Sequence, residues 1–246
     1  MSKQAAGSRE RVLERVRRAL AGGGAAGAEA RAGGDLSGGA PAAPPAFDEA
    51  LVRLAGPDDD LVALFARRAT EIGATVRTIA SADLAGGLAG LLEEIGACTA
   101  VSALDLPEAA GLAEAAARRG VRVARAADVP LRVAPDASAG AISVETADVG
   151  ITGVAWALAE TGTLVCTSDR EERSVSLMPP VHIAVVRASD IVPDLVDAVR
   201  ALGARASLPS AVTLITGPSK TADIEGILVT GVHGPGRLCI VLVPDR

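Results

Sequence analysis

A lysine in the segment TGPSK, residues 216–220, is the most distinctive chemical group of this sequence. Lys220 is one of only two lysines, with Lys3, and arginine supplies all the other basic side chains. A glycine–proline turn precedes it, and Ser219 is a suitable N-cap for a short helix running through Glu225. The free N–H groups of a helix start attract anions, and the lysine ammonium adds positive charge. The segment therefore predicts a small-anion site, although its residue order differs from that of a nucleotide-binding P-loop.

A second glycine-rich loop, GVHGPG at residues 231–236, follows one short predicted strand. It contains His233, and histidine can accept or donate a proton near neutral pH. The alternative is a simple turn between two strands. We take His233 as a candidate catalytic residue and Gly234 as a candidate substrate-binding residue.

The segment AETGT, residues 159–163, also combines a charged residue with a tight turn. Residues 152–160 are expected to form a short helix that ends at Glu160. A carboxylate is unfavourable at the negative end of a helix dipole, so Glu160 should have a functional or tertiary partner. It is a second candidate catalytic residue. The hydroxyl groups of Thr161 and Thr163 and the backbone of Gly162 are candidate substrate contacts.

A third candidate region is SVSLMPPVHIAVV, residues 174–186. His182 opens a predicted buried strand, where a histidine is either a hydrogen-bonded core residue or a site residue. Arg173 lies just upstream with Arg170 on a predicted exposed loop, where arginine can attract anions. His182 and Arg173 are therefore candidate substrate-binding residues.

The elements that must position these residues alternate between helix and strand. This alternation predicts an α/β fold with a mixed, mainly parallel sheet covered by helices, and more strand than helix in the second half. Helices are predicted over 57–74, 81–97, 106–120 and within 191–203. Strands are predicted over 75–80, 98–103, 121–125, 162–168, 181–187, 211–217, 226–231 and 237–244.

The first 46 residues differ from this body. Residues 1–20 form a predicted amphipathic basic helical arm, with six basic against two acidic side chains. Residues 21–46 are nearly all Gly, Ala and Pro, which is typical of a flexible linker. The α/β domain is expected over 47–246. The arm can pack on its own domain or on a neighbouring subunit, so a homo-oligomer formed through it is one expectation.

Composition excludes several classes of partner. A net charge of −6 and 1% aromatic residues argue against nucleic-acid binding. Cys98, Cys166 and Cys239 lie far apart beside apolar runs, so we expect small buried side chains and no metal or cofactor held by this chain. The sequence contains no apolar run long enough for a membrane span and no secretory signal, which predicts a cytoplasmic location.

Four segments in this order resemble the LUD-domain family, in particular its lactate utilization protein C group: AETGT at 159–163, LMPPVHIAVV at 177–186, GPSKTADIE at 217–225 and GVHGP at 231–235. The resemblance implies a fold of the NagB/RpiA/CoA-transferase type. It also implies a part in the oxidation of L-lactate to pyruvate, together with partner proteins that carry the iron–sulfur clusters. The scattered cysteines agree with electron transfer through such partners.

Three functions remain open at this point. In the first, the chain is a subunit that binds the carboxylate of lactate or pyruvate through Lys220, Ser219 and Arg173. Alternatively it is a stand-alone CoA transferase or sugar-phosphate isomerase that uses Glu160 as nucleophile or base, an argument by fold analogy. The third possibility is a structural or regulatory subunit without a small-molecule site. The first function predicts that Glu160, Lys220 and His233 meet in one carboxylate-sized pocket.

Overall fold

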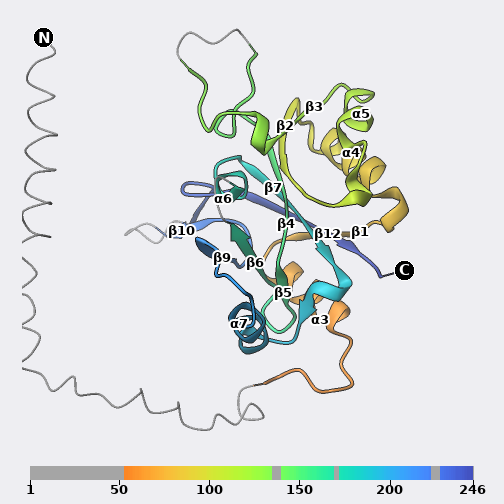
Figure 1. Cartoon of the computed structure of the whole chain (residues 1–246), viewed down its shortest axis with the longest axis vertical. Coiled ribbons are helices and arrows are strands. Elements are labelled where there is room, and N and C mark those ends of the chain that lie inside the picture. Colours follow the sequence, from red (N-terminus) through yellow and green to blue (C-terminus); the bar gives the residue numbers. More distant parts are fainter. Residues whose placement is uncertain (1–52, 135–139, 169–171, 223–227, 246) are drawn as a thin grey trace, which may run out of the picture. The chain divides into compact units, whose positions relative to one another are not determined.

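The computed structural model describes residues 53–134, 140–168, 172–222 and 228–245 (Figure 1). The predicted helical arm, the linker and the expected start of the domain at residue 47 lie outside these residues, as do Arg170 and Glu225.

A six-stranded, fully parallel sheet forms the centre of the fold. Its order is β1-β12-β7-β4-β2-β3. The two central strands β7 and β4 are buried along almost their whole length, as expected for a parallel sheet covered on both faces. The strands span Thr75–Thr78 (β1), Thr99–Ala103 (β2), Arg122–Arg125 (β3), Val149–Gly153 (β4), Val181–Arg187 (β7) and Arg237–Val243 (β12).

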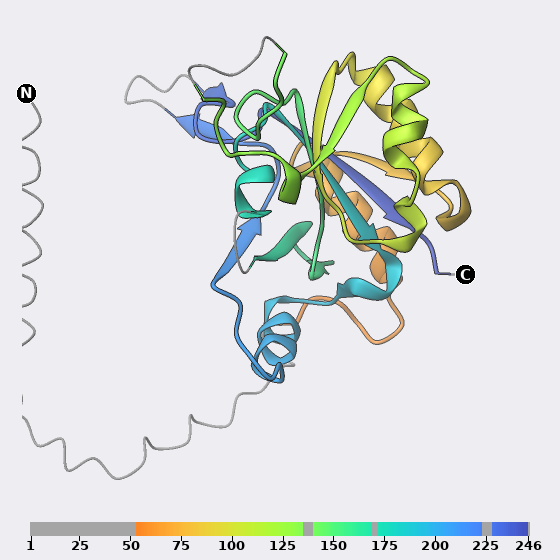
Figure 2. The same cartoon turned by 45° about the horizontal axis from the view of Figure 1, so that its top comes forward.

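Alternate residues of the central strands pack into two separate cores. Ile183 of β7 packs with α4 (Leu84–Ile95) and α5 (Leu112–Ala117) on one face. Ala184 packs with α3 (Leu61–Glu71) on the other, where Phe65 is fully buried. Figure 2 shows α4 and α5 together beside β2 and β3. The Asp60 side chain caps α3 by accepting hydrogen bonds from the N–H groups of Val62 and Ala63.

A smaller four-stranded sheet lies on the α3 side and contains the mixed pairing expected in the second half of the chain. Its order is β8-β5-β6-β9, with β5 parallel to β8 and the other pairs antiparallel. A two-stranded hairpin, β10-β11, is separate. The strands span Trp156–Leu158 (β5), Thr163–Ser168 (β6), Ile191–Val192 (β8), Ala211–Ile215 (β9), Lys220–Ala222 (β10) and Leu228–Thr230 (β11). The remaining helices are α6 (Glu172–Val175) and α7 (Leu195–Gly203), with single 3₁₀ turns at Ser81–Asp83, Pro107–Ala109, Ala126–Asp128 and Ala188–Asp190. The predicted α/β class with a mainly parallel sheet is confirmed.

Two predicted helices are wrong. Residues 152–160 form the end of β4 and then β5, because a short apolar run has no clear period and its distant strand partners decide its conformation. The segment after Ser219 is strand β10, paired with β11. The N–H group of Ser219 donates to the Pro235 carbonyl at 2.8 Å, so it is not a free helix-start donor.

The cysteines are only partly as expected. Cys239 is buried and Cys166 half-buried, whereas Cys98 is exposed, because it lies just before β2 rather than within it. All three are free thiols. Among the helices that the structure describes, none is long and apolar enough to cross a membrane.

Candidate functional site

The chain path reverses between β2 and β4 of the parallel sheet. From β2 the chain moves outward to β3, whereas from β4 it continues to β7 and β12 on the other side. Open α/β sheets bind ligands outside the carboxyl ends of the strands at such a point. A cavity of about 440 Å³ lies here, which we call the switch-point cavity. Its lining includes residues 103–106 from the end of β2 onward, residues 152–156 from the end of β4 to the start of β5, and residues 166–168 of β6.

Two arginines line this cavity. Arg173 comes from α6 and Arg205 from the segment after α7. Both side chains are exposed, and among the residues that the structure describes neither has an ion-pair or hydrogen-bond partner. The lining also contains the carboxylate of Asp105 and the indole of Trp156, the only tryptophan of the chain. The arrangement offers two guanidinium groups to an anion beside an aromatic wall.

A glycine of β4 allows α6 to lie directly on the sheet. A Cβ atom at Gly150 would lie 1.9 Å from the carbonyl oxygen of Val175 and 3.1 Å from Cγ of Pro179. Only glycine allows this approach between the backbones. The resulting position of α6 places Arg173 and Ser176 in the cavity lining.

Three polar side chains lie next to one another at the cavity wall: Thr152 and His182 are buried, and Cys166 is half-buried. Thr152 Oγ1 lies 2.9 Å from Nε2 of His182, and the Thr152 hydroxyl also interacts with the Cys166 thiol. His182 is only 1% exposed, and burial lowers its pKa to about 4. Burial also raises the pKa of the Cys166 thiol to about 12. All three groups are therefore uncharged at neutral pH. Nδ1 of His182 has no hydrogen-bond partner among the described residues.

A second cavity, of about 330 Å³, contains half of the candidate site residues singled out from the sequence. Ser219, Lys220, His233 and Gly234 line it together with His182, and we call it the motif cavity. It lies at the amino ends of β7 and β12, where His182 pairs in register with Leu238. Ser176 and Thr213 line both this cavity and the switch-point cavity, so the two are neighbours.

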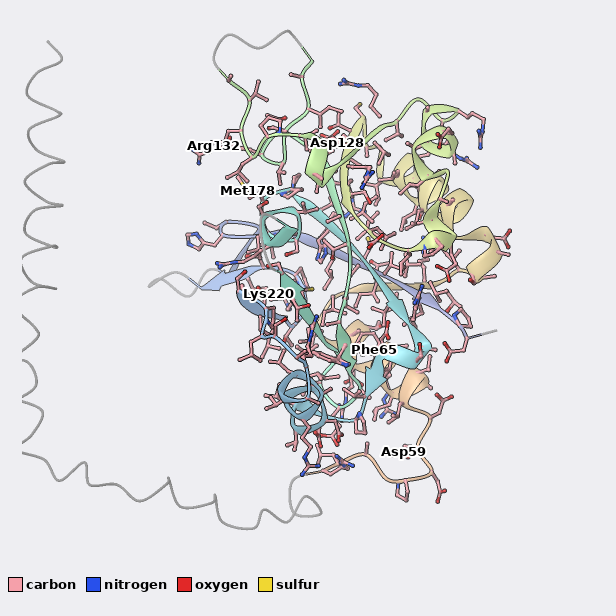
Figure 3. The ribbon with its side chains drawn as sticks, in the orientation of Figure 1. Asp59, Phe65, Asp128, Arg132, Met178 and Lys220 are labelled. Carbon is pink, nitrogen blue, oxygen red and sulfur yellow. The ribbon has the colours of Figure 1, made fainter. Side chains whose placement is uncertain are left out.

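Lys220 has a structural partner in this arrangement. Its Nζ donates to the carbonyl oxygen of Ile72 at 3.0 Å, and Ile72 is the C-cap of α3. Gly217 has a positive φ of 77°, and a Cβ there would lie 2.9 Å from the same oxygen. The TGPSK segment thus packs against the carboxyl end of α3, where a cation is favoured by the helix dipole. Figure 3 shows Lys220 beside β9 and β10.

We expect Lys220→Met to lower the free energy of unfolding by about 0.5–1 kcal/mol, because it removes one hydrogen bond to a helix carboxyl end. Urea unfolding measures this. The substitution should leave the affinity for small carboxylates unchanged. A loss of carboxylate binding would instead assign the anion site to the motif cavity.

The AETGT segment also packs on α3. Oε1 of Glu160 accepts hydrogen bonds from the N–H groups of Leu54 and Ala55 at 2.6 and 2.7 Å, so this carboxylate has a tertiary partner. Gly162 has a φ of 66°, and a Cβ there would lie 2.5 Å from the N atom of Ala69 in α3. Glu160 lines a third cavity, of about 320 Å³, with Thr161 and Thr163.

The two threonines of that segment form a chain of hydroxyl groups. Thr161 Oγ1 lies 2.8 Å from Thr163 Oγ1, which lies 2.9 Å from Thr216 Oγ1. The chain joins the start of β6 to the end of β9. The structure therefore brings Lys220, His233, Ser219, Gly234 and His182 together, places Arg173 in the neighbouring switch-point cavity, and places Glu160 in a separate one.

Sequence reasoning did not single out Thr152, Cys166, Arg205 and Trp156, which line the switch-point cavity. Thr152 had a usable signal, since it is a polar residue between apolar neighbours in the run VGITGV. Arg205 had none, because only the fold brings the segment after α7 to the ends of β2 and β4.

Comparison with known proteins assigns the family. The LUD-domain profile matches residues 62–243. The chain belongs to the LUD-domain family. The matched residues of this LUD domain include every described strand and helix from β1 to β12 and both larger cavities.

Curated relatives match this LUD domain over part of its length. Lactate utilization protein C of Halalkalibacterium halodurans is 47% identical over 107 residues, which is 42% of this chain and 46% of the relative. Lactate utilization protein C of Bacillus subtilis is 47% identical over 107 residues, 42% of this chain and 45% of the relative. The matched region spans about half the length of these relatives.

A solved structure shares the fold. The crystal structure of a DUF162 family protein from Deinococcus radiodurans has a TM-score of 0.52 and 27% sequence identity, covering 75% of this chain and 96% of that one. The similarity therefore extends over most of the LUD domain.

Proposed function

We propose that this chain is a component of L-lactate utilization that binds the carboxylate of L-lactate or pyruvate in the switch-point cavity. The observation that carries the proposal is the pair of arginines, Arg173 and Arg205, that line a cavity at the switch point without a described anionic partner. The names of the relatives support the choice of lactate and pyruvate among small carboxylates.

The chemistry of the cavity fits a 2-hydroxy or 2-oxo acid. A guanidinium binds a carboxylate with two parallel hydrogen bonds, which fixes both position and orientation. The hydroxyl groups of Thr152, Ser168 and Ser176 provide donors and acceptors for a second oxygen. A small polar ligand thus meets charge at one end and neutral hydroxyl groups at the other.

The oxidation itself removes two electrons and two protons from L-lactate to give pyruvate. We propose that partner proteins carrying iron–sulfur clusters accept these electrons, and that this chain contributes the ligand site to their complex. No cofactor is assigned to this chain in the proposal.

Titration with L-lactate and pyruvate tests the binding site directly. Trp156 lines the cavity and is the only tryptophan in a chain without tyrosine, so its fluorescence reports on this cavity alone. We expect saturable changes with both ligands. Arg173→Gln and Arg205→Gln should each weaken binding about 10- to 100-fold, since a charge-assisted hydrogen bond contributes about 1.5–3 kcal/mol.

Arg118→Gln is the matched control. Arg118 is an exposed arginine at the end of α5 and does not line the cavity, so the same substitution should leave the dissociation constant unchanged. Equal weakening by all three substitutions would indicate a nonspecific charge effect. Absence of any saturable response, by fluorescence and by calorimetry, would refute the carboxylate site.

A further inference from the structure

His182 has an unusual pair of environments for a buried histidine. Its Nε2 lies 2.9 Å from Thr152 Oγ1, whereas Nδ1 has no partner among the described residues. Buried polar atoms are nearly always hydrogen-bonded, so an exception requires an explanation. A histidine at a site is usually fixed in one tautomer by the bond that its second nitrogen makes. His182 lacks that second bond, so neither neutral tautomer is fixed.

Thr152 connects this histidine to the switch-point cavity. A threonine hydroxyl donates one hydrogen bond and accepts two. Thr152 lines the cavity, bonds His182 and reaches the Cys166 thiol, so the direction of its single proton depends on its neighbours.

Two arrangements of protons satisfy this geometry. In the first, the Thr152 hydroxyl donates to Nε2, the ring proton is on Nδ1, and Oγ1 is free to accept a hydrogen bond from a ligand hydroxyl. In the second, Nε2–H of His182 donates to Oγ1, and the Thr152 hydroxyl donates to a ligand carbonyl. The first fits a 2-hydroxy acid and the second a 2-oxo acid.

We propose that Thr152 binds the oxygen on carbon 2 of a 2-hydroxy or 2-oxo carboxylate, and that His182, as a positioning residue, changes tautomer between the two. The inference rests on the proposed function, because it requires a carboxylate ligand in the switch-point cavity. The pair therefore recognises both the reduced and the oxidised ligand, without a change of charge.

The electrostatics of the site supports a change of tautomer in which His182 stays neutral. Burial lowers the pKa of His182 to about 4 and raises that of the Cys166 thiol to about 12, so the three side chains stay uncharged at physiological pH. The ionisable groups of the surroundings lie in the cavity linings: Asp105, Arg173 and Arg205 on the Thr152 side, and Lys220 and His233 on the other. A shift of the ring proton between nitrogens adds no charge to either cavity.

Three ligands distinguish binding of the carboxylate from binding of the oxygen on carbon 2. L-lactate and pyruvate carry an oxygen on carbon 2, whereas propionate carries only the carboxylate. Thr152→Val should weaken L-lactate and pyruvate about tenfold and leave propionate unchanged, as measured by Trp156 fluorescence and calorimetry. Ser143→Ala is the control and should leave all three affinities unchanged, because it also removes a buried hydroxyl group but lies outside the linings of the three cavities.

The tautomer has a direct spectroscopic signature. The chain contains two histidines, so His233→Gln leaves His182 as the single ¹⁵N-histidine signal. The ¹⁵N shifts should report Nδ1–H with L-lactate bound and Nε2–H with pyruvate bound. A merely structural role for His182 would give the same tautomer with both ligands.

The outcomes are distinct. If none of the three carboxylates binds, the proposed function fails and this inference fails with it. If propionate binds but Thr152→Val weakens all three ligands equally, or weakens none, the carboxylate site stands and the role of Thr152 is wrong. If the same ¹⁵N tautomer is seen with both L-lactate and pyruvate, the role of His182 is wrong.

Discussion

Replacing Gly150 by alanine should destabilise the protein by about 3 kcal/mol, the largest effect expected from any single added methyl group in the cavity region. The new Cβ would lie 1.9 Å from the carbonyl oxygen of Val175, a backbone atom that cannot rotate away. Either β4 or α6 must move. Because α6 carries Arg173 and is followed directly by Ser176, the same substitution should also abolish carboxylate binding.

Two other glycines provide controls for this effect. Gly153 lies in the same strand, but a Cβ there would meet its nearest atom, Cδ1 of Leu104, at an ordinary 3.6 Å. Gly153→Ala should therefore change the free energy of unfolding by less than about 1 kcal/mol. Gly86 in α4 has open space around its Cβ position, so Gly86→Ala should stabilise the protein by about 0.5–1 kcal/mol and leave binding intact. Equal unfolding energies for Gly150→Ala and Gly153→Ala would show that α6 is not seated on Gly150.

The fold was largely predictable because its signals are local. The alternation of amphipathic helices with short apolar strands is visible in the pattern of apolar and polar residues along each segment, and it predicts the parallel sheet. Strand assignment failed at residues 152–160, where the decisive hydrogen bonds come in part from β2, β7 and β8, far away in the sequence.

The site was less predictable for a related reason. Lys220 and Glu160 are unusual residues beside glycines, and they were interpreted as ligand-binding chemistry. In the structure both bind the protein backbone, Lys220 at the end of α3 and Glu160 at residues 54–55. A charged residue that binds a backbone group and one that binds a ligand can occur in the same local sequence pattern. The distinction depends on where α3 packs.

The switch-point cavity illustrates the opposite case. Thr152 and Arg205 are ordinary residues in their own segments, and they meet only because β4 and the chain after α7 converge on one cavity. His182 was found from the sequence because a histidine at the start of an apolar strand is conspicuous. The same rule, a polar side chain inside an apolar strand, identifies Thr152 and would have located the cavity wall.

The stability of the protein should depend on pH through His182. The folded-state pKa of about 4 lies below the ordinary value of 6.5 because burial disfavours the charged ring. Between these pH values the unfolded chain binds a proton that the folded protein does not. The free energy of unfolding should therefore fall as the pH drops from 6.5 to 4, with a slope approaching about 1.4 kcal/mol per pH unit and a total of about 3 kcal/mol.

Urea unfolding at several pH values measures this loss, and His182→Gln should remove it, since glutamine does not titrate. His233→Gln replaces the exposed histidine and should leave the loss in place. Carboxylate groups change the free energy of unfolding at lower pH values. For Asp148, burial opposes the shift, but hydrogen bonds from the N–H groups of Thr99 and Cys98 outweigh it and lower the pKa below 3.8, so its contribution is lost only as the pH falls past that value. A curve that stays flat between pH 6.5 and 4 would mean that the His182 ring is hydrated in the folded protein, and the unfixed tautomer would then lose its physical basis.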